Sequence, residues 1–270
     1  MFTFTTLASS SLGNTALVSC GDTHILLDAG ISAKRITAGL AELGVMPHQL
    51  SAILLTHEHS DHVSGLRVLT KKAGAPIYAT RPTCQEWYRK NRCDQVKDLF
   101  QPIEPGDGVQ LGPLWAESFP TPHDAAGSVG WSIAGEGGRM VLCTDLGHVT
   151  DQVRRAAAGC DLLVCETNHD EDWVRTGPYP YYLKQRILGD YGHLSNEAGA
   201  ELAAFAVESG TRAVILAHLS QTNNTPVRAY EAVSLRLRAM DCDPERDISL
   251  TVAPRDTVGT TWSSKEVSVC

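Results

Sequence analysis

The chain has 270 residues, of which 43% are hydrophobic and 20% are charged, and its formal net charge is −8 at pH 7. This composition is typical of a globular protein with a sizeable core. It excludes a uniformly basic nucleic-acid-binding protein but leaves room for a local positive site. No apolar run approaches the ~18 residues of a membrane span, and the N-terminal residues lack the basic and apolar regions of a signal peptide. We therefore expect a cytoplasmic protein without a membrane segment.

Short apolar strands alternate with amphipathic helices, and no internal repeat, low-complexity segment or flexible linker interrupts them. The predicted strands span residues 15–19, 24–27, 51–56, 76–80, 108–111, 114–119, 130–133, 139–143, 161–165 and 213–217. The predicted helices span residues 33–43, 64–72 and 196–208, with Gly44 and Gly210 placed to end the first and the last. This pattern favours sheets covered by helices, and we expect one domain over residues 1–270.

The cysteines indicate a reducing compartment. Eight are present, they are scattered along the chain, and none belongs to a CxxC pair. A chain of this length buries enough apolar surface to fold without disulfide crosslinks. We therefore expect reduced and mostly buried thiols, with the terminal Cys270 exposed.

A dense group of metal-ligand side chains follows the third predicted strand. The run THEHSDH at residues 56–62 contains His57, His59, Asp61 and His62. Imidazole and carboxylate groups are ligands that zinc, manganese and iron accept. A turn at a strand end can direct alternate side chains at two different ions. The run therefore predicts a metal site, because three histidines this close together on a turn have no structural purpose.

Three more ligand-capable residues follow apolar strands elsewhere in the chain. They are His123, Asp145 and His218. The ends of strands are where a rigid scaffold presents functional side chains. Their shared placement predicts that they join the histidine-rich turn in one site.

HxHxDH followed by separate His, Asp and His residues at strand ends resembles the metallo-β-lactamase superfamily. The resemblance implies an α/β (α+β) fold, a four-layer αββα sandwich with two metal ions at one edge. It also implies the following ligands: His57, His59 and His123 for one ion, Asp61, His62 and His218 for the other, and Asp145 as a bridge between them.

The resemblance implies hydrolysis with a metal-bridging hydroxide as nucleophile. It also implies two divalent ions as cofactors, Zn²⁺ or Mn²⁺, with iron as a further candidate. Two such ions outweigh the negative charges of Asp61, Asp145 and the hydroxide, so the pocket is positive inside an acidic protein. An anionic phosphodiester is therefore a natural substrate.

Sequence blocks between residue 7 and about residue 226 resemble, in order, those of the YycJ/WalJ family. They include residues 7–14, 56–62, 118–125, 144–147, 166–170, 192–196 and 217–224. Ser10 is a small departure, because the family usually has glycine there. The resemblance implies a metal-dependent 5′→3′ exonuclease that acts on double-stranded DNA in DNA repair.

His193 precedes the predicted helix at 196–208. In the phosphodiesterase branch of the superfamily, a histidine placed this way serves the leaving oxygen. The resemblance therefore implies that Asp61 and His193 are catalytic, with a protonated His193 donating to the leaving oxygen. A helix cap or a further metal ligand are the alternatives for His193. His169 and Asp170 are candidates for supporting the metal ligands through hydrogen bonds.

The stretch 175–191 interleaves four tyrosines with Lys184 and Arg186. Aromatic and cationic side chains together suit nucleic acid, through base stacking and phosphate contacts. A tyrosine-rich lid packed on the edge of the sandwich is an equal alternative. Residues 9–14 could offer backbone N–H groups to a phosphate. The predicted substrate contacts are thus Asn14, Lys184 and Arg186.

A second class of function competes with the nuclease. A small-molecule metallohydrolase acting on lactones, thioesters or cyclic phosphodiesters would need the same metal ligands. His24, His48 and His148 have no place in either scheme and are expected to be ordinary polar or core residues. The metal chemistry follows from the residues, whereas DNA as the substrate follows from the resemblance.

Overall fold

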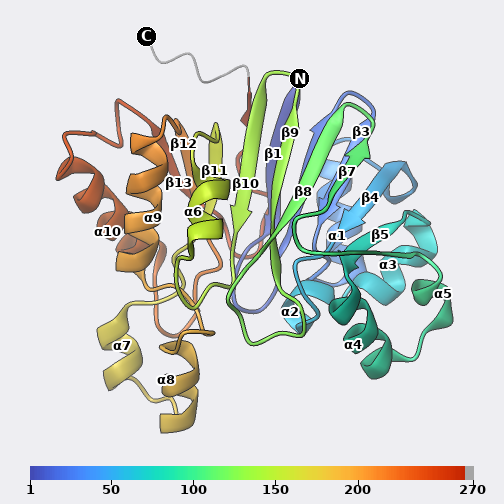
Figure 1. Ribbon diagram of the computed structural model, residues 1–270, viewed down its shortest axis with the longest axis horizontal. Helices are drawn as coiled ribbons and strands as arrows, with labels where there is room; N and C mark the ends of the chain where they lie inside the picture. The colour runs from blue at the N-terminus through green and yellow to red at the C-terminus, as the bar shows by residue number, and fades with distance from the viewer. Residues whose placement is uncertain (265–270) are drawn as a thin grey trace.

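The computed structural model describes residues 1–264 and contains two seven-stranded mixed sheets packed face to face (Figure 1). In spatial order, the first sheet consists of β14 (Trp262–Ser263), β1 (Phe2–Ala8), β2 (Thr15–Cys20), β3 (Thr23–Leu27), β4 (Leu50–Leu54), β5 (Ile77–Thr80) and β6 (Phe100–Ile103). The second consists of β13 (Ser249–Val252), β12 (Ala213–Ala217), β11 (Leu162–Glu166), β10 (Gly138–Cys143), β9 (Val129–Gly135), β8 (Leu114–Pro120) and β7 (Gly108–Leu111).

Helices cover the outer face of each sheet (Figure 1). The helices of the first half are α1 (Ala33–Glu42), α2 (Ser60–Val63), α3 (Leu66–Ala73), α4 (Arg81–Asn91) and α5 (Asp94–Lys97), with a 3₁₀ turn at Pro47–Gln49. The helices of the second half are α6 (Asp151–Ala157), α7 (Glu171–Thr176), α8 (Tyr181–Ile187), α9 (Asn196–Glu208) and α10 (Pro226–Arg238). Of these, α7 and α8 project below the sheets. The layers confirm the predicted αββα sandwich.

The central core lies between the two sheets. Phe4 and Leu54 of the first sheet and Trp131 and Val164 of the second belong to one buried apolar cluster. The Trp131 indole N–H also donates to the carbonyl of Leu55 at 3.1 Å. This bond joins β9 to the chain just after β4, where the histidine-rich turn begins. The core thus fixes the site-bearing end of β4 against the second sheet.

Two sets of parallel strands decide where the functional residues gather. Strands β3, β4 and β5 are parallel in the first sheet, and β10, β11 and β12 are parallel in the second. Parallel strands end on the same side of their sheet, so the turns after β4, β10, β11 and β12 collect at one edge of the sandwich. That edge is the lower one in Figure 1, near α2, α7 and α8.

Local signals account for the elements that the sequence predicts correctly. Helix α9 begins after Ser195, whose hydroxyl accepts the N–H of Ala198, as expected of an N-cap. Helix α1 is followed by Gly44 with a φ of +74°, a left-handed conformation that favours glycine. The predicted helix at 64–72 differs, because the chain forms α2 and α3 with Gly65 between them. A Cβ at Gly65 would lie 2.1 Å from the carbonyl oxygen of Ile31, so only glycine fits this close approach.

Within residues 1–264 the cysteines are free, and Cys20, Cys84, Cys143, Cys160 and Cys165 are buried. This confirms the prediction of reduced and mostly buried thiols for the described part of the chain. Cys270 lies outside the described residues. The prediction that residues 1–270 form a single domain stays a prediction.

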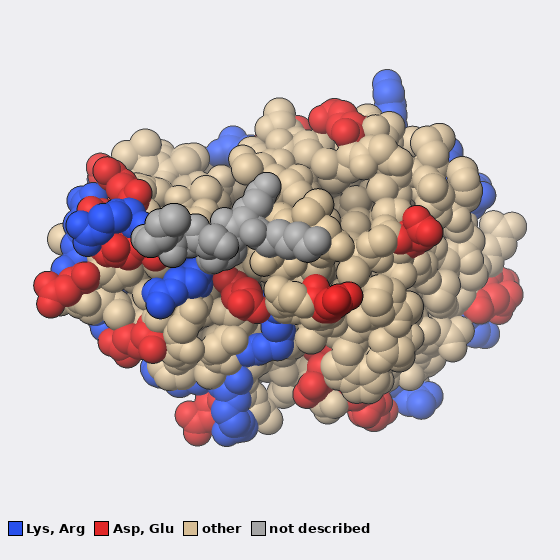
Figure 2. Space-filling model, turned by 90° about the horizontal axis from the view of Figure 1, so that it is seen from above, with Lys and Arg blue, Asp and Glu red and all other residues tan. Residues whose placement is uncertain are grey.

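The face away from the metal-ligand edge carries scattered charges of both signs (Figure 2). Lysine and arginine side chains alternate there with aspartate and glutamate around a large uncharged area. Among residues 1–264, no helix is long and apolar enough to cross a membrane.

Leu54→Ala should test whether the central core supports the strand that leads into the site. Leu54 is 0% exposed in β4, so the substitution should lower the free energy of unfolding by about 2–5 kcal/mol. The matched control is Leu235→Ala on α10, where the side chain is 74% exposed and the change should stay within about 0.5 kcal/mol. Urea unfolding of both variants measures the difference. Equal effects at the two positions would contradict the assigned core.

Candidate metal centre

The structure brings the predicted metal ligands to one edge of the sandwich. The histidine-rich turn follows β4, Asp145 follows β10 and His218 follows β12, while His123 comes from the loop after β8. Asp145 and His218 have φ angles of +62° and +59°. Such left-handed conformations are uncommon outside glycine and are often found where a side chain is aimed at a functional site.

His57, His59 and His123 form the first ligand group. Each offers a ring nitrogen, and these nitrogens lie within 4.8 Å of one another. The pKa of His57 is lowered well below its ordinary value by burial and by the neighbouring imidazoles, which leaves the neutral form that binds metals. Its Nε2 is buried and has no hydrogen-bond partner among the described residues. A divalent cation is the partner that this geometry fits.

Asp61, His62 and His218 form the second group, again within 4.8 Å. Oδ2 of Asp61 lies 3.3 Å from Nε2 of His62 and 3.4 Å from Nε2 of His218. Burial alone would lower the pKa of His218, but Asp145, Asp61 and Glu166 raise it to about 10. A protonated His218 must lose its proton before its ring nitrogen can bind a metal ion, so we expect metal binding to release a proton here.

The Asp145 carboxylate lies between the two groups. Its Oδ2 is 3.3 Å from Nε2 of His62, and its Oδ1 is 3.5 Å from Nε2 of His218 and 3.7 Å from Nε2 of His123. One carboxylate therefore reaches imidazoles of both groups. Oδ2 accepts no hydrogen bond within the described residues although it is buried. The nitrogen and oxygen donors fit divalent metal ions.

A buried carboxylate behind His62 fixes how its ring is presented. Oδ2 of Asp28 lies 2.8 Å from Nδ1 of His62, and Oδ1 of Asp28 accepts the N–H of Thr56 at 2.8 Å. The Thr56 hydroxyl donates to the same carboxylate at 2.9 Å. With Nδ1 occupied, Nε2 of His62 faces the ligand groups. Such outer hydrogen bonds orient metal-binding histidines and increase their basicity.

Glu166 has the same supporting role for two histidines, and sequence reasoning missed it. Its Oε1 lies 2.9 Å from Nδ1 of His218 and 2.8 Å from Nδ1 of His193. Its Oε2 accepts the backbone N–H groups of Leu146 and Leu194. Burial would raise the pKa of Glu166, but the two imidazoles lower it below its ordinary value. One signal in the sequence could have indicated this role: Glu166 ends an apolar strand, just as Asp145 and His218 follow apolar strands.

Comparison with known proteins decides the family. Residues 23–219 match the Beta-lactamase superfamily domain. Exodeoxyribonuclease WalJ of Streptococcus pneumoniae serotype 2 (strain D39) is 37% identical over 257 residues, which cover 95% of this chain and 96% of that protein. The chain belongs to the YycJ/WalJ family. Exodeoxyribonuclease YycJ of Bacillus anthracis is likewise 37% identical over 233 residues, covering 86% of this chain and 87% of that protein.

A solved structure agrees with the fold. The metallo-beta-lactamase fold protein YhfI of Bacillus subtilis superposes with a TM-score of 0.71 at 18% identity, covering 97% of this chain and 98% of that chain. At this identity the likeness concerns the fold alone. It confirms the metallo-β-lactamase sandwich for this YycJ/WalJ family member.

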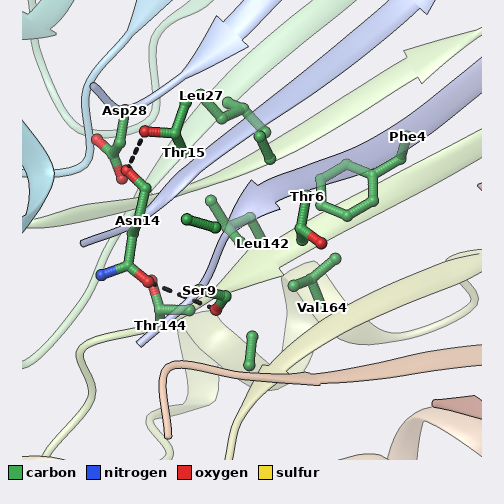
Figure 3. Close-up of a pocket in the computed structure, with 13 residues that line it drawn as sticks. Phe4, Thr6, Ser9, Asn14, Thr15, Leu27, Asp28, Leu142, Thr144 and Val164 are labelled. Carbon is green, nitrogen blue, oxygen red and sulfur yellow. Dashed lines mark hydrogen bonds between the residues drawn. The ribbon is translucent and has the colours of Figure 1, made fainter. Parts of the chain in front are cut away.

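Asn14 points into the protein beside the metal centre, in the small cavity of about 20 Å³ between the sheets (Figure 3). Its amide donates to the carbonyl of Ser10 at 2.9 Å and lies 3.2 Å from Nε2 of His62. The backbone N–H groups of residues 9–14 all have partners, and that of Asn14 donates to the Asp61 carbonyl at 2.8 Å. The expectation that this segment offers free N–H groups to a phosphate is therefore wrong. Substrate contact by Asn14 itself stays a prediction.

The stretch 175–191 forms one wall of the metal-site cavity, which has a volume of about 170 Å³. Tyr179 and Arg186 line it, and Arg186 pairs with Asp124 at 2.5 Å between Nε and Oδ2. Lys184 instead donates to the carbonyl of Arg175 at 2.8 Å. The other three tyrosines are 63–77% exposed, which contradicts the alternative of a packed tyrosine-rich lid. They are Tyr181, Tyr182 and Tyr191.

The remaining histidines and Asp170 lie outside the ligand groups found within residues 1–264. Asp170 caps α7 by accepting the N–H of Trp173 and pairs with Arg228, so the expectation that it supports a metal ligand is wrong. His169 is buried, and burial lowers its pKa to about 4. His24 contacts Ser19, and His148 contacts the carbonyl of Asp190.

Glu166→Gln should weaken metal binding about 10- to 100-fold. The amide keeps the shape of the side chain but removes the charge that holds two imidazoles in one orientation. Competition with a metal chelator measures the affinity. The control is Glu171→Gln on α7, whose carboxylate pairs with the exposed Arg175. Unchanged affinity in Glu166→Gln would show that the carboxylate does not orient the ligands.

Proposed function

We propose that the chain is a two-metal phosphodiesterase that digests double-stranded DNA in the 5′→3′ direction during DNA repair in the cytoplasm. The observation that carries the proposal is the pair of ligand groups that share the Asp145 carboxylate. Relatives over most of the chain that are named exodeoxyribonucleases support DNA as the substrate. Arg186 lines the cavity beside the metal ligands, and its positive charge is compatible with a substrate that carries phosphate groups.

Seven side chains would hold two divalent ions, Zn²⁺ or Mn²⁺. The proposed ligands are His57, His59, Asp61, His62, His123, Asp145 and His218. Ions bound there would polarise a phosphoryl oxygen and lower the pKa of a water molecule. The carboxylate of Asp61 is 21% exposed and borders the cavity, so it can also accept a hydrogen bond from that water and orient it.

His193 would move a proton at the leaving oxygen. Its Nδ1 lies 2.8 Å from Oε1 of Glu166, so the opposite ring nitrogen is left for the cavity that His193 lines. The contact with the Glu166 carboxylate fixes the orientation of the ring. A proton donated from His193 would neutralise the oxygen that departs from phosphorus. Glu166 is accordingly a positioning residue for both His193 and His218.

Arg186 would contact the phosphate next to the one that is cleaved. It is the one Lys or Arg side chain among the described residues that line the cavity. Its guanidinium can form two parallel hydrogen bonds with phosphate oxygens, in exchange for its present pairing with Asp124. Lys184 does not line the cavity and would meet the strand only beyond it. Asn14 is buried beside His62, so a contact with the strand there would have to pass the metal ligands.

Purified protein loaded with Mn²⁺ or Zn²⁺ should degrade 5′-labelled duplex DNA to mononucleotides. Labels at the 5′ and 3′ ends distinguish the direction, because digestion from the 5′ end releases only the 5′ label early. Lactones, thioesters and cyclic phosphodiesters serve as competing substrates. Efficient turnover of one of these with no cleavage of DNA under any metal would establish the small-molecule hydrolase instead.

Asp145→Asn should reduce activity by about 10³-fold or more and lower the bound metal content. Asparagine tolerates the left-handed backbone at this position, where φ is +62°, so the loss would report the missing charge rather than strain. Asp241→Asn is the matched control. Asp241 also has a left-handed backbone, with a φ of +60°, but it belongs to none of the ligand groups among the described residues. Elemental analysis measures the metal. Full metal content with full activity in Asp145→Asn would refute the bridging role.

His193→Ala should retain both metals but cut DNA about 10²- to 10⁴-fold more slowly. Hydrolysis of bis(4-nitrophenyl) phosphate should fall much less, because nitrophenolate leaves without a proton. The ratio of the two rates separates a proton donor from a residue that only shapes the cavity. Loss of metal in His193→Ala would reassign His193 as a ligand.

A further inference from the structure

The charges of the chain are strongly segregated. Residues 31–100 contain 10 lysines and arginines against 6 aspartates and glutamates, a formal net charge of +4. The rest of the chain contains 13 against 25, a net charge of −12. A protein with a total charge of −8 therefore carries a positive region, and that region includes the histidine-rich turn. The helices of this region cover the outer face of the first sheet (Figure 1).

The positive charge is concentrated on two neighbouring helices. Helices α1 and α3 together hold five lysines and arginines and one acid, Glu42, at the last residue of α1. Lys34, Arg67, Lys71 and Lys72 are exposed, and none of these four forms a salt bridge within the described part of the chain. In the acidic part of the chain, six arginines do pair with acids. They are Arg175, Arg186, Arg228, Arg236, Arg238 and Arg246.

These helices begin next to the metal ligands. The N–H of Ala29 donates to the carbonyl of His62 at 2.8 Å, and the N–H of Gly65 donates to the carbonyl of Ala29 at 2.8 Å. The segment that leads into α1 is thus bonded both to His62 of the turn and to Gly65, the residue before α3. Figure 1 shows α2 near the lower edge of the sheets and α3 higher up, on the outer side of the first sheet. The cations therefore extend outward from the site.

We propose that the exposed faces of α1 and α3 bind the phosphate backbone of the duplex whose end lies at the metal centre. This inference rests on the proposed nuclease function. The cavity of about 170 Å³ is far too small to hold a duplex, so most of a bound duplex must lie against the outside. Arg67 and Lys71 are four residues apart on α3, about 6 Å along the helix axis. That spacing is close to the rise of two phosphates on one strand, at about 3.4 Å each.

The surface supplies affinity without sequence preference. Unpaired cations bind phosphates by releasing the counterions condensed on DNA, and each contact contributes about 0.9 to the slope of log K against log salt. An exonuclease must hold any sequence and move along it, so backbone contacts suit it better than contacts with base edges. The cations lie outside the cavity that holds the reacting atoms, so their removal should affect duplex binding rather than chemistry.

The test compares two double variants with equal loss of charge. Arg67→Gln/Lys71→Gln removes the proposed contacts, and Arg155→Gln/Arg212→Gln removes two exposed arginines of the acidic part that form no salt bridge among residues 1–264. Binding of a fluorescent duplex with phosphorothioate ends is measured with metal-loaded protein over a range of salt. The first variant should lower the slope by about 1.8, which corresponds to binding weakened about 60-fold at ~0.1 M salt and about 10-fold at ~0.3 M salt. The second should match the wild type.

Turnover provides the second measurement. In the Arg67→Gln/Lys71→Gln variant, the KM for duplex DNA should rise while kcat at saturation and hydrolysis of bis(4-nitrophenyl) phosphate stay at wild-type levels. A wild-type slope in this variant, with duplex binding intact, would overturn the α1–α3 surface and leave the nuclease proposal standing. Wild-type protein that hydrolyses the small diester but neither binds nor cleaves duplex DNA would overturn both.

Discussion

Buried carboxylates at one edge of the sandwich are the constraint around which the rest of the site is arranged. Asp28, Asp145 and Glu166 are at most 2% exposed, and a buried carboxylate is costly unless it is paired and hydrogen-bonded. Imidazoles supply the pairing, because Asp28 and Glu166 each face the Nδ1 of a ligand histidine. The opposite nitrogens then converge on Asp145, whose charge is shared by three rings. Divalent cations complete this balance better than protons do, because they can satisfy several donors at once.

The same arrangement explains the unusual backbone at this edge. Asp28, Asp145 and His218 all have positive φ angles close to +60°, which cost of order 1–3 kcal/mol each at non-glycine residues. Each lies just past a strand whose apolar side chains are buried between the sheets or under helices. The core therefore holds the strands in place while the chain turns sharply to direct a polar side chain at the site. The packing of the strands thus offsets the cost of the left-handed backbone at their ends.

How much could be predicted depends on whether a signal was local. The turn at 56–62 places its ligands side by side in the sequence, so the metal site was predictable. The residues that begin and end α9, Ser195 and Gly210, directly flank the helix in the sequence, so its bounds were predictable too. Strand β1 was not predicted, because it lies between two other strands and buries Thr5 and Thr6 together with its apolar residues. The support role of Glu166 depends on histidines 27 and 52 residues away. Only the packing of β11 between β10 and β12 brings these groups together.

Segment 9–14 shows that a local signal can also mislead when distant residues decide the structure. Its small polar residues suggest a flexible phosphate-binding loop, yet its N–H groups bond to residues as distant as Leu219 and Pro254. The loop instead positions Asn14 against His62 and so belongs to the support of the metal centre.

Anion binding near the site is then left to cations rather than to backbone amides. In a chain with a net charge of −8, those cations are useful only if they are kept free of acids and close to the metals. Four cations of α1 and α3 form no salt bridge among the described residues, and the segments that lead into these helices lie beside the metal-ligand turn, whereas six arginines of the acidic part pair with an acid. Segregation of charge, rather than total charge, therefore determines which side of this protein an anionic polymer can approach.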